Sequence, residues 1–458
     1  MALIVTSDYE LQHTVAPRLP KAPPQYQAQY QDQLTNVLRL YFNQLDQIIG
    51  QLMTGTTSTV PVSIDGTNTD AFGRLRVSSP YTLFDSQNRF AADNQFDTAL
   101  TGTGSSTWQV NKSAVDMAVT AGGVGSVVRQ TYRVFPYQPG KGLLVLATFV
   151  MDGSTATTLT QRVGYFGTQN GVFFQKVGST NSFVLRSYTS GSVDDSRTVN
   201  QSAWNGDKLD GTGDSGYVLD PSKSQILWMD FEWLGVGSVR CGFIIDGQYI
   251  VCHTFNNANS ITGVYMTTAI LPVRYEITST VAVAATLTQI CCSVVSEGGY
   301  EQTSIAHAAR RTAVLTTIGT TFLPLVSIRI ASTALGAVVL PSTISVIPTT
   351  SQNYEIALVK NPTLTGASWA SVPTDSNVQY DVAATAVTGG SIVQTQYVTS
   401  SGSGGTGTVS VPTGYNWDLQ LGVSLTSVSD IYTIQIRTVS GATTGDAFGT
   451  LSFYDLTQ

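Results

Sequence analysis

Two neighbouring runs of sequence decide the fold class: ILWMDFEWLG at residues 226–235 and CGFIIDGQYIVC at residues 241–252. The first run is rich in aromatic and branched apolar residues, which favour a β-strand. The second run carries Asp246-Gly247 at its centre. A two-residue Asp-Gly turn between apolar segments is a strong short-range signal for a β-hairpin. We therefore expect a strand followed by a hairpin, with Ile245 paired to Gln248 across the turn.

The four cysteines are too few for a disulfide scaffold, and no CxxC is present. The expected hairpin register brings Cys241 opposite Cys252, where a bridge is geometrically conceivable. We expect a reduced pair of core thiols, because assembly in a reducing cytosol disfavours disulfides. Cys291 and Cys292 are neighbours and would point to opposite faces of a strand, and we expect both to be small core residues.

The same β pattern extends on both sides of this stretch, from Tyr81 to about Glu297, with short strands broken by Gly, Asn and Asp. Spacing of this kind predicts a two-sheet sandwich or jelly roll, and we assign residues 60–300 to it. The strand and Asp-Gly hairpin at 226–252 also resemble the pattern of concanavalin-like sandwiches. The clearest predicted strands are 127–135, 143–151, 162–166, 171–177, 183–188, 226–234, the hairpin 241–255 and 264–277.

A second β pattern begins near Phe322, and we assign residues 312–458 to a smaller C-terminal β-sandwich. Residues 301–311 interrupt the two patterns, and we interpret them as a linker, with a short helix as the alternative. The run SSGSGGTGT at residues 400–408 predicts a flexible loop. The predicted strands are 325–330, 337–346, 354–360, 392–398, 417–423, 432–438 and 451–456.

The N-terminal part has a different character. Residues 1–24 contain four prolines and predict an extended arm. Residues 25–59 predict a helix and linker for oligomerisation or attachment. Within residues 26–53, apolar residues follow one another at steps of four and three, which is the seam of a coiled coil. The seam consists of Leu34, Leu38, Tyr41, Leu45, Ile48 and Leu52. We expect a homotrimer, and the alternative is an amphipathic helix lying on its own domain.

Composition excludes several classes of function. The chain has 458 residues, a formal net charge of −7 and only 12% charged residues. Nucleic-acid binding through a basic patch is therefore not expected. No apolar run is long enough to insert into a membrane. The N-terminus lacks the basic flank and apolar core of a signal peptide, so we expect synthesis in the cytoplasm and release by a route other than secretion.

The motifs that carry chemistry are weak. GTGDSG at residues 211–216 matches a dinucleotide fingerprint and a protease nucleophile loop, but it lacks the surrounding helix and the upstream triad residues. Asp207, Asp210 and Asp214 lack the spacing of a known calcium loop, so turn formation is the preferred interpretation and calcium the alternative. We therefore predict no catalytic residues, no metal ligands and no cofactor. The pair Asp230 and Glu232 keeps a polysaccharide-degrading enzyme as a third alternative.

Aromatic residues beside Gly-rich loops give the remaining binding signal. Tyr165, Phe166, Phe173 and Phe174 are candidates for stacking on a host-surface glycan, with core packing as the alternative.

Several blocks of the chain resemble uncharacterised structural proteins of the virions of tailed bacteriophages, including phages of cyanobacteria. The blocks include PKAPP at residues 20–24, LRLYFNQL at 38–45, DAFGRLRVS at 70–78 and LTGASW at 364–369. The resemblance implies a multimeric component of a particle, built in the host cytoplasm and located in the virion. A trimeric tail fibre or spike is our first expectation, and a head fibre or capsid decoration protein is the second. Its implied partners are further copies of itself and other virion proteins, bound through the N-terminal arm and helix.

Overall fold

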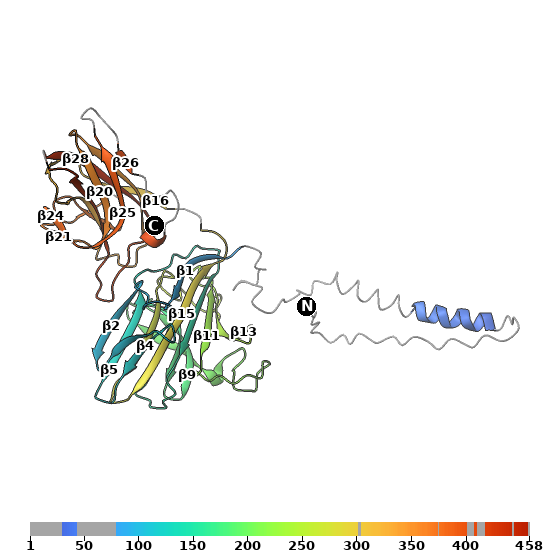
Figure 1. The fold of residues 1–458 in the computed structure, drawn as a ribbon. Helices are drawn as coiled ribbons and strands as arrows, with labels where there is room; N and C mark the ends of the chain where they lie inside the picture. The colour runs from blue at the N-terminus through green and yellow to red at the C-terminus, as the bar shows by residue number, and fades with distance from the viewer. Residues whose placement is uncertain are drawn as a thin grey trace. The chain divides into compact units, whose positions relative to one another are not determined.

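The computed structural model describes residues 30–43, 79–300, 304–373, 375–400, 407–409, 417–441 and 444–456. These residues are mainly β, as the sequence predicts, and they form sandwich-like pairs of sheets (Figure 1). The chain divides into two units, residues 1–65 and residues 66–458. We describe each unit by itself.

In the first unit, the described residues form one helix, residues 30–43. Leu34, Leu38 and Tyr41 of the predicted seam lie on it and are half-buried. The remaining seam residues, Leu45, Ile48 and Leu52, and the predicted arm at residues 1–24, lie outside the described residues. The coiled coil and the trimer therefore stay predictions. No helix among the described residues is both long and apolar enough to cross a membrane.

The first sandwich consists of two antiparallel sheets. The eight-stranded sheet has the order β13 (Gln248–Phe255), β12 (Val239–Ile245), β11 (Gln225–Phe231), β6 (Leu143–Val150), β15 (Ala285–Ser296), β4 (Ala114–Val119) and β3 (Ser105–Gln109), and β1 (Tyr81–Gln87) also pairs with β15. The seven-stranded sheet has the order β10 (Asp194–Asn200), β9 (Thr180–Ser187), β8 (Gly171–Val177), β7 (Leu159–Phe166), β14 (Val273–Ser279), β5 (Gly125–Thr131) and β2 (Phe96–Gly102). A short 3-10 helix, η1 (Gln201–Ala203), follows β10.

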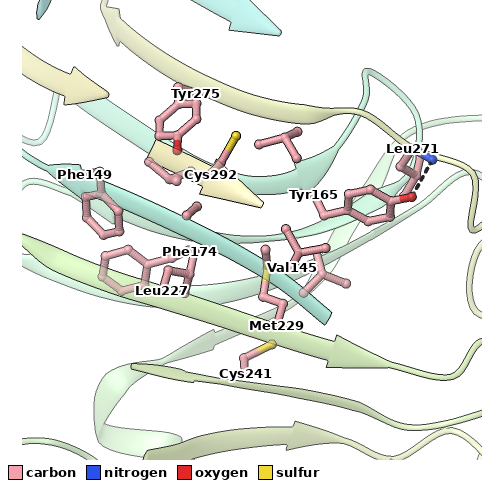
Figure 2. Close-up of a cluster of buried hydrophobic side chains, with 14 of the residues drawn as sticks. Val145, Phe149, Tyr165, Phe174, Leu227, Met229, Cys241, Leu271, Tyr275 and Cys292 are labelled. Atoms are coloured by element: carbon pink, nitrogen blue, oxygen red, sulfur yellow. Dashed lines mark hydrogen bonds between the residues drawn. The ribbon is translucent and has the colours of Figure 1, made fainter. Parts of the chain in front are cut away.

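Strict alternation along the strands places the core between the two sheets. On β6, Leu143, Val145, Ala147 and Phe149 are buried, and the residues between them are half-buried. Because successive side chains of a strand point to opposite faces, this pattern puts every second residue of β6 into one core. Phe149 meets Phe174 of the facing sheet with ring centroids 6.0 Å apart, and Figure 2 shows both rings among the buried side chains.

The hairpin β12–β13 forms around Asp246-Gly247, as predicted. Both turn residues have positive φ angles of 51° and 77°, which an Asp-Gly type I′ turn requires. Ile245 pairs with Gln248.

The predicted cysteine register is wrong, because a bulge inserts residue 252 and places Cys241 opposite His253. Cys241 and Cys252 are free and fully buried, and burial raises the pKa of both thiols. Cys292 is buried as expected, whereas Cys291 is only half-buried.

The second sandwich has a five-stranded and a six-stranded sheet around a separate core. The five-stranded sheet has the order β16 (Ile305–Arg310), β28 (Gly445–Asp455), β19 (Val339–Pro348) and β26 (Gly407–Val409), with β17 (Leu315–Ile318) also paired to β28. The six-stranded sheet has the order β22 (Ala370–Ser371), β23 (Val378–Asp381), β18 (Leu323–Ile330), β27 (Ile431–Thr438), β20 (Asn353–Lys360) and β25 (Ser391–Thr399). Strands β21 (Thr363–Thr365) and β24 (Ala386–Thr388) form a separate pair.

Two predictions fail in this half of the chain. Residues 301–311, predicted as a linker or short helix, contain β16, because pairing with β28 overrides the local preference of an Ala-rich run. Residues 417–423, predicted as a strand, begin instead with a 3-10 helix, η2 (Trp417–Leu419). Apolar residues alternate in this segment, but its backbone hydrogen bonds do not form a ladder with a neighbouring strand.

Residues 417–425, which we call the joint segment, connect the two sandwiches. Trp417 belongs to the core of the first sandwich, and its Nε1 donates to the Tyr81 hydroxyl at 3.0 Å. Arg133 Nη1 donates to the Trp417 carbonyl at 2.6 Å. Further along, the Val423 amide donates to the Tyr132 carbonyl at 2.8 Å. The joint segment is therefore fixed to β1 through Tyr81 and to residues 132 and 133, which follow β5.

Candidate binding face on the seven-stranded sheet

The four aromatic residues predicted to stack on a glycan, Tyr165, Phe166, Phe173 and Phe174, are all buried, with exposed fractions of 0–1%. The prediction of accessible stacking rings is therefore wrong for all four. The two strands, β7 and β8, are covered on both faces. Tyr165 and Phe174 point into the core between the sheets, whereas Phe166 and Phe173 form a separate cluster.

Tyr165 has a structural role in the core. Its hydroxyl lies 3.2 Å from the Phe135 carbonyl oxygen and 3.0 Å from the Ala269 carbonyl oxygen. It also accepts a hydrogen bond from the Leu271 amide at 3.0 Å, drawn as the dashed line in Figure 2. Burial raises the pKa of Tyr165 well above its ordinary value. The Tyr165 hydroxyl therefore links residues 135 and 269–271 to β7.

Phe166 and Phe173 pack with Val184 in a small apolar cluster, with ring centroids 4.4 Å apart. Three arginines from three strands cover these rings. Arg162 lies 5.5 Å from the Phe173 centroid, Arg186 lies 5.1 Å from the same centroid, and Arg274 lies 5.4 Å from the Phe166 centroid. Each distance is within the range of a cation–π contact. We call these six residues the arginine–phenylalanine face.

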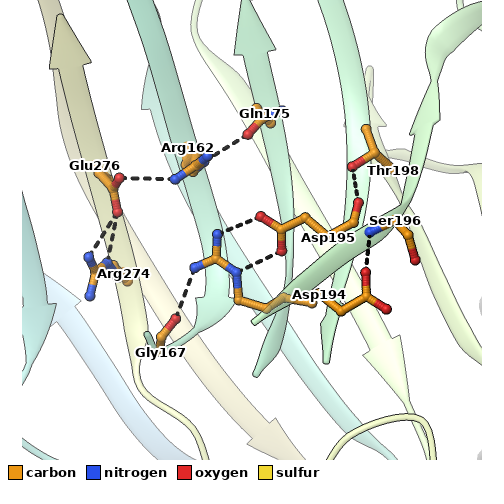
Figure 3. A network of polar contacts seen from close by, with 10 residues as sticks. Arg162, Gly167, Gln175, Asp194, Asp195, Ser196, Thr198, Arg274 and Glu276 are labelled. Atoms are coloured by element: carbon orange, nitrogen blue, oxygen red, sulfur yellow. Dashed lines mark hydrogen bonds and ion pairs between the residues drawn. The ribbon is translucent and has the colours of Figure 1, made fainter. Parts of the chain in front are cut away.

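Hydrogen bonds hold the three guanidinium groups in place (Figure 3). Arg186 binds Asp195 through two N–H···O bonds of 2.8 Å each. Glu276 accepts from Arg162 at 3.1 Å and from Arg274 at 2.9 and 3.1 Å. Three guanidinium groups thus share two carboxylates, so the face has a net positive charge on a chain of net charge −7. Burial lowers the pKa of Arg162, and the charge of Glu276 opposes this effect.

A glycine makes this packing possible. Gly164 on β7 is paired in register with Phe173 on β8. A Cβ atom at residue 164 would lie 2.6 Å from both Cα and Cβ of Phe173, a distance that real Cβ atoms do not reach. The backbone of β7 therefore passes directly beside Phe173, and the ring of Phe173 stays beneath the arginines.

Asp230 and Glu232, the pair that kept an enzyme under consideration, are both fully buried. Asp230 forms an ion pair of 2.5 Å with Arg240. Glu297 joins them: a Cβ atom at Gly142 would lie 3.0, 3.5 and 3.8 Å from oxygens of Glu297, Asp230 and Glu232. The carboxyl groups of Asp230 and Glu232 lie out of reach of solvent.

The aspartates considered for calcium form turns. Asp207 accepts hydrogen bonds from the amides of Leu209 and Ser215, both at 2.8 Å. Asp210 accepts from the amide and hydroxyl of Thr212 at 2.9 and 2.5 Å. Among the described residues, no group of three or more His, Cys, Asp or Glu side chains is arranged to hold a metal ion.

A cavity of about 260 Å³ lies where the joint segment meets the first sandwich. Its lining is mixed: Thr82, Leu83, Phe84, Asp85, Gln95, Arg133, Trp417 and Asp418. Arg133 is committed there to the Trp417 carbonyl and to Gln95 Oε1, both at 2.6 Å. The cavity is therefore part of the joint.

Sequence reasoning missed the three arginines of the face because they come from strands far apart in the chain. Within β7, however, Arg162 and Phe166 are four residues apart and share a face. In β9, Val184 and Arg186 share a face in the same way. Arginines that share a strand face with apolar residues are the signal that could have indicated this arrangement.

No protein-family model matches the chain, and no curated protein matches it. Among solved structures, the chain is similar to the carbohydrate recognition domain of Emp47p, with 10% identity, a TM-score of 0.30 and coverage of 48% of this chain and 97% of that chain. It is also similar to a protein of unknown function from Shewanella oneidensis MR-1 (10% identity, TM-score 0.31, coverage of 49% and 90%). Peanut lectin is another similar structure (10% identity, TM-score 0.29, coverage of 48% of this chain and 98% of that chain). TM-scores of this size carry no argument about ligand or function.

Proposed function

We propose that this chain is a structural component of a tailed-phage virion that assembles through its N-terminal helix and displays its β-sandwiches. The helix is the observation that carries this proposal. Leu40 and Phe42 are 60% and 61% exposed, and Leu34, Leu38 and Tyr41 are only half-buried. A helix of 14 residues is marginal in water on its own, so its apolar side chains call for a partner.

A further copy of the same helix is the partner that the sequence favours. The seam repeats every seven residues, and matching seams are what identical helices bury against one another. We propose a homotrimer on a tail fibre or spike, with a head fibre or decoration protein as the alternative location. Four blocks of sequence resemble virion proteins, at residues 20–24, 38–45, 70–78 and 364–369. This resemblance supports the proposal that the chain is part of a virus particle.

We expect Leu34→Asp with Leu38→Asp to abolish this assembly, because carboxylates at the seam would be desolvated without a partner, at a cost of several kcal/mol. Light scattering should show a trimer for the unaltered protein and a monomer for the double variant. Asn36→Asp is the matched control, since residue 36 is exposed and off the seam. A monomeric unaltered protein would refute helix-driven assembly.

The particle itself is tested separately. Particles purified from a lysate by density gradient should contain the chain in stoichiometric amounts by mass spectrometry. Antibodies against residues 79–300 should mark either the tail or the head in electron micrographs. A chain that remains in the soluble fraction of the lysate and is missing from purified particles would exclude the virion.

The proposal assigns recognition of a host-surface glycan to the arginine–phenylalanine face. Planar guanidinium groups supported on aromatic rings bind carboxylate, sulfate and phosphate groups with defined geometry. Arg162 has the most accessible side chain of the three, with 23% exposed, compared with 9% for Arg186 and 10% for Arg274. An acidic polysaccharide is therefore the class of glycan that this face would take.

We expect Arg162→Gln to weaken binding to an immobilised acidic polysaccharide by about tenfold or more, which is the loss of one charge-assisted hydrogen bond. Arg437→Gln is a matched control. Arg437 also stacks on a phenylalanine, Phe322, at 4.6 Å and pairs with Glu355, but it lies on the second sandwich. Equal affinity of both variants and the unaltered protein for the polysaccharide would refute the assignment.

A further inference from the structure

Strand β25 (Ser391–Thr399) is the last strand of the six-stranded sheet. Among the described residues its only ladder partner is β20, so its other edge carries backbone N–H and C=O groups without a strand partner. Ile392, Val393 and Tyr397 are 60%, 41% and 64% exposed. A strand this long and this exposed is what natural proteins usually protect at a sheet edge.

The usual protections are weak on β25. Its sequence, SIVQTQYVT, contains no charged residue, no proline and no glycine, although those residues are what keep edges from pairing. One bulge, at Val393, bends the strand near its start. The opposite edge of the same sheet is β22, which has only two residues. The sheet therefore has one blunt edge and one edge open to pairing.

The pattern of β25 is symmetric about Thr395. Read outward in both directions, the residue types are polar, apolar, apolar and polar on each side. An antiparallel copy with its two-fold axis at Thr395 would place Ile392 opposite Val398 and Val393 opposite Tyr397. The polar residues would also meet polar residues: Gln394 with Gln396, Ser391 with Thr399, and Thr395 with itself.

We propose that β25 is a self-association edge that pairs antiparallel with β25 of a second copy of this chain, with Thr395 at the two-fold axis. The symmetric pattern argues for a copy of the same strand, because a one-residue slip would oppose apolar to polar side chains. Uncharged residues on both strands remove the repulsion that keeps like edges apart. The ladder gives affinity, and the symmetric order of polar and apolar side chains gives register.

This contact is separate from the helix seam, since β25 lies in the six-stranded sheet of the second unit. A single strand pair buries little area, so a pair of isolated chains is held weakly. Assemblies that present several copies of β25 gain from avidity, because each further contact is intramolecular. The edge would therefore join one assembled oligomer to another.

Cysteine crosslinking of the full chain tests the register. Thr395 is the one position that meets its own copy, with directly opposed Cβ atoms about 4.5–5.5 Å apart. We expect Thr395→Cys to give about tenfold more disulfide dimer under mild oxidation than Ala370→Cys, because disulfide geometry is specific. Residue 370 is an exposed position on the opposite edge strand. Gln396→Cys should also give little dimer, because residue 396 would face residue 394.

The unaltered protein gives the background from the native cysteines, of which Cys241, Cys252 and Cys292 are buried. Equal yields from Thr395→Cys and Ala370→Cys would overturn the proposal, as would equal yields from residues 395 and 396. A further variant combines Thr395→Cys with Leu34→Asp and Leu38→Asp. Dimer that persists in this variant shows that the edge pairs without the helix, and a lower yield that still exceeds the yield from Ala370→Cys in the same background shows an edge contact strengthened by avidity. Equal yields from the two positions in this background would show that the helix alone brings the copies together.

Discussion

Replacing Arg129 with alanine should lower the free energy of unfolding by about 3–5 kcal/mol, the cost of emptying a large buried site and stranding its polar partners. Arg129 is only 4% exposed and lies between the two sheets of the first sandwich. It donates to Gln289 Oε1 at 2.5 Å, to Thr98 Oγ1 at 2.9 Å and to the Asp93 carbonyl at 2.8 Å. Its guanidinium also lies 4.9 Å from the Phe96 ring centroid.

The loss is large because Gln289 belongs to the facing sheet and is completely buried. Without Arg129, the side-chain oxygen of Gln289 loses its charged donor. Burial lowers the pKa of Arg129, while the charge of Asp93 opposes that effect. Arg129 thus links the two sheets through hydrogen bonds to other residues of the protein.

Urea unfolding followed by tryptophan fluorescence measures this effect. Arg89→Ala is the control, because Arg89 is exposed and surface substitutions of this kind change stability by about 0.5 kcal/mol or less. Arg129→Met together with Gln289→Met should recover part of the loss, because it fills the site and removes the stranded amide of Gln289. If Arg129→Ala and Arg89→Ala unfold alike, the bonds across the core contribute little.

Trp417→Ala should uncouple the two sandwiches, so that one thermal transition becomes two. Trp417 is 8% exposed and packs edge-on against Tyr300, with centroids 4.9 Å apart. The residue follows the strands of one sandwich in sequence but is buried in the core of the other. Removing a buried tryptophan side chain costs about 3–5 kcal/mol, and here that cost falls on the contact between two cores.

Differential scanning calorimetry separates the two transitions. Trp369→Ala is the matched control, because Trp369 is half-buried under Arg329 at 4.3 Å within the second sandwich. That variant leaves the joint intact, so it should keep a single transition and lower the temperature of that transition. A single transition in Trp417→Ala, at the same width as in the unaltered protein, would show that the joint segment does not couple the cores through this ring.

The sequence was most informative where structure is local. Strand β8 coincides with the predicted run at 171–177, and β6, β18 and β20 lie within two residues of their predictions. The Asp-Gly turn was also predicted, since its backbone angles are set by two residues. Apolar alternation and turn chemistry need no knowledge of distant residues.

The sequence was least informative where a residue distant in the chain determines the local structure. Strand β10 has exposed alternate residues and few apolar ones, and it exists because β9 pairs with it. Residues 417–423 alternate like a strand, yet their backbone partners lie at residues 132 and 339. Phe166 and Phe173 looked accessible beside Gly-rich turns. Only the fold reveals that arginines from β7, β9 and β14 converge above them.

The long strand β15 also sets the timing of folding during synthesis. Strand β6, which ends at residue 150, pairs with β11 from residue 225 and with β15 from residue 285. At ribosomal rates of about 5–20 residues per second, the edge of β6 that pairs with β15 stays unpaired for on the order of 10 s. A nascent chain that stops before residue 285 has no strand to connect β6 with β4 and β1. Translation speed between residues 150 and 296 therefore determines how long this apolar sheet stays open to other nascent chains.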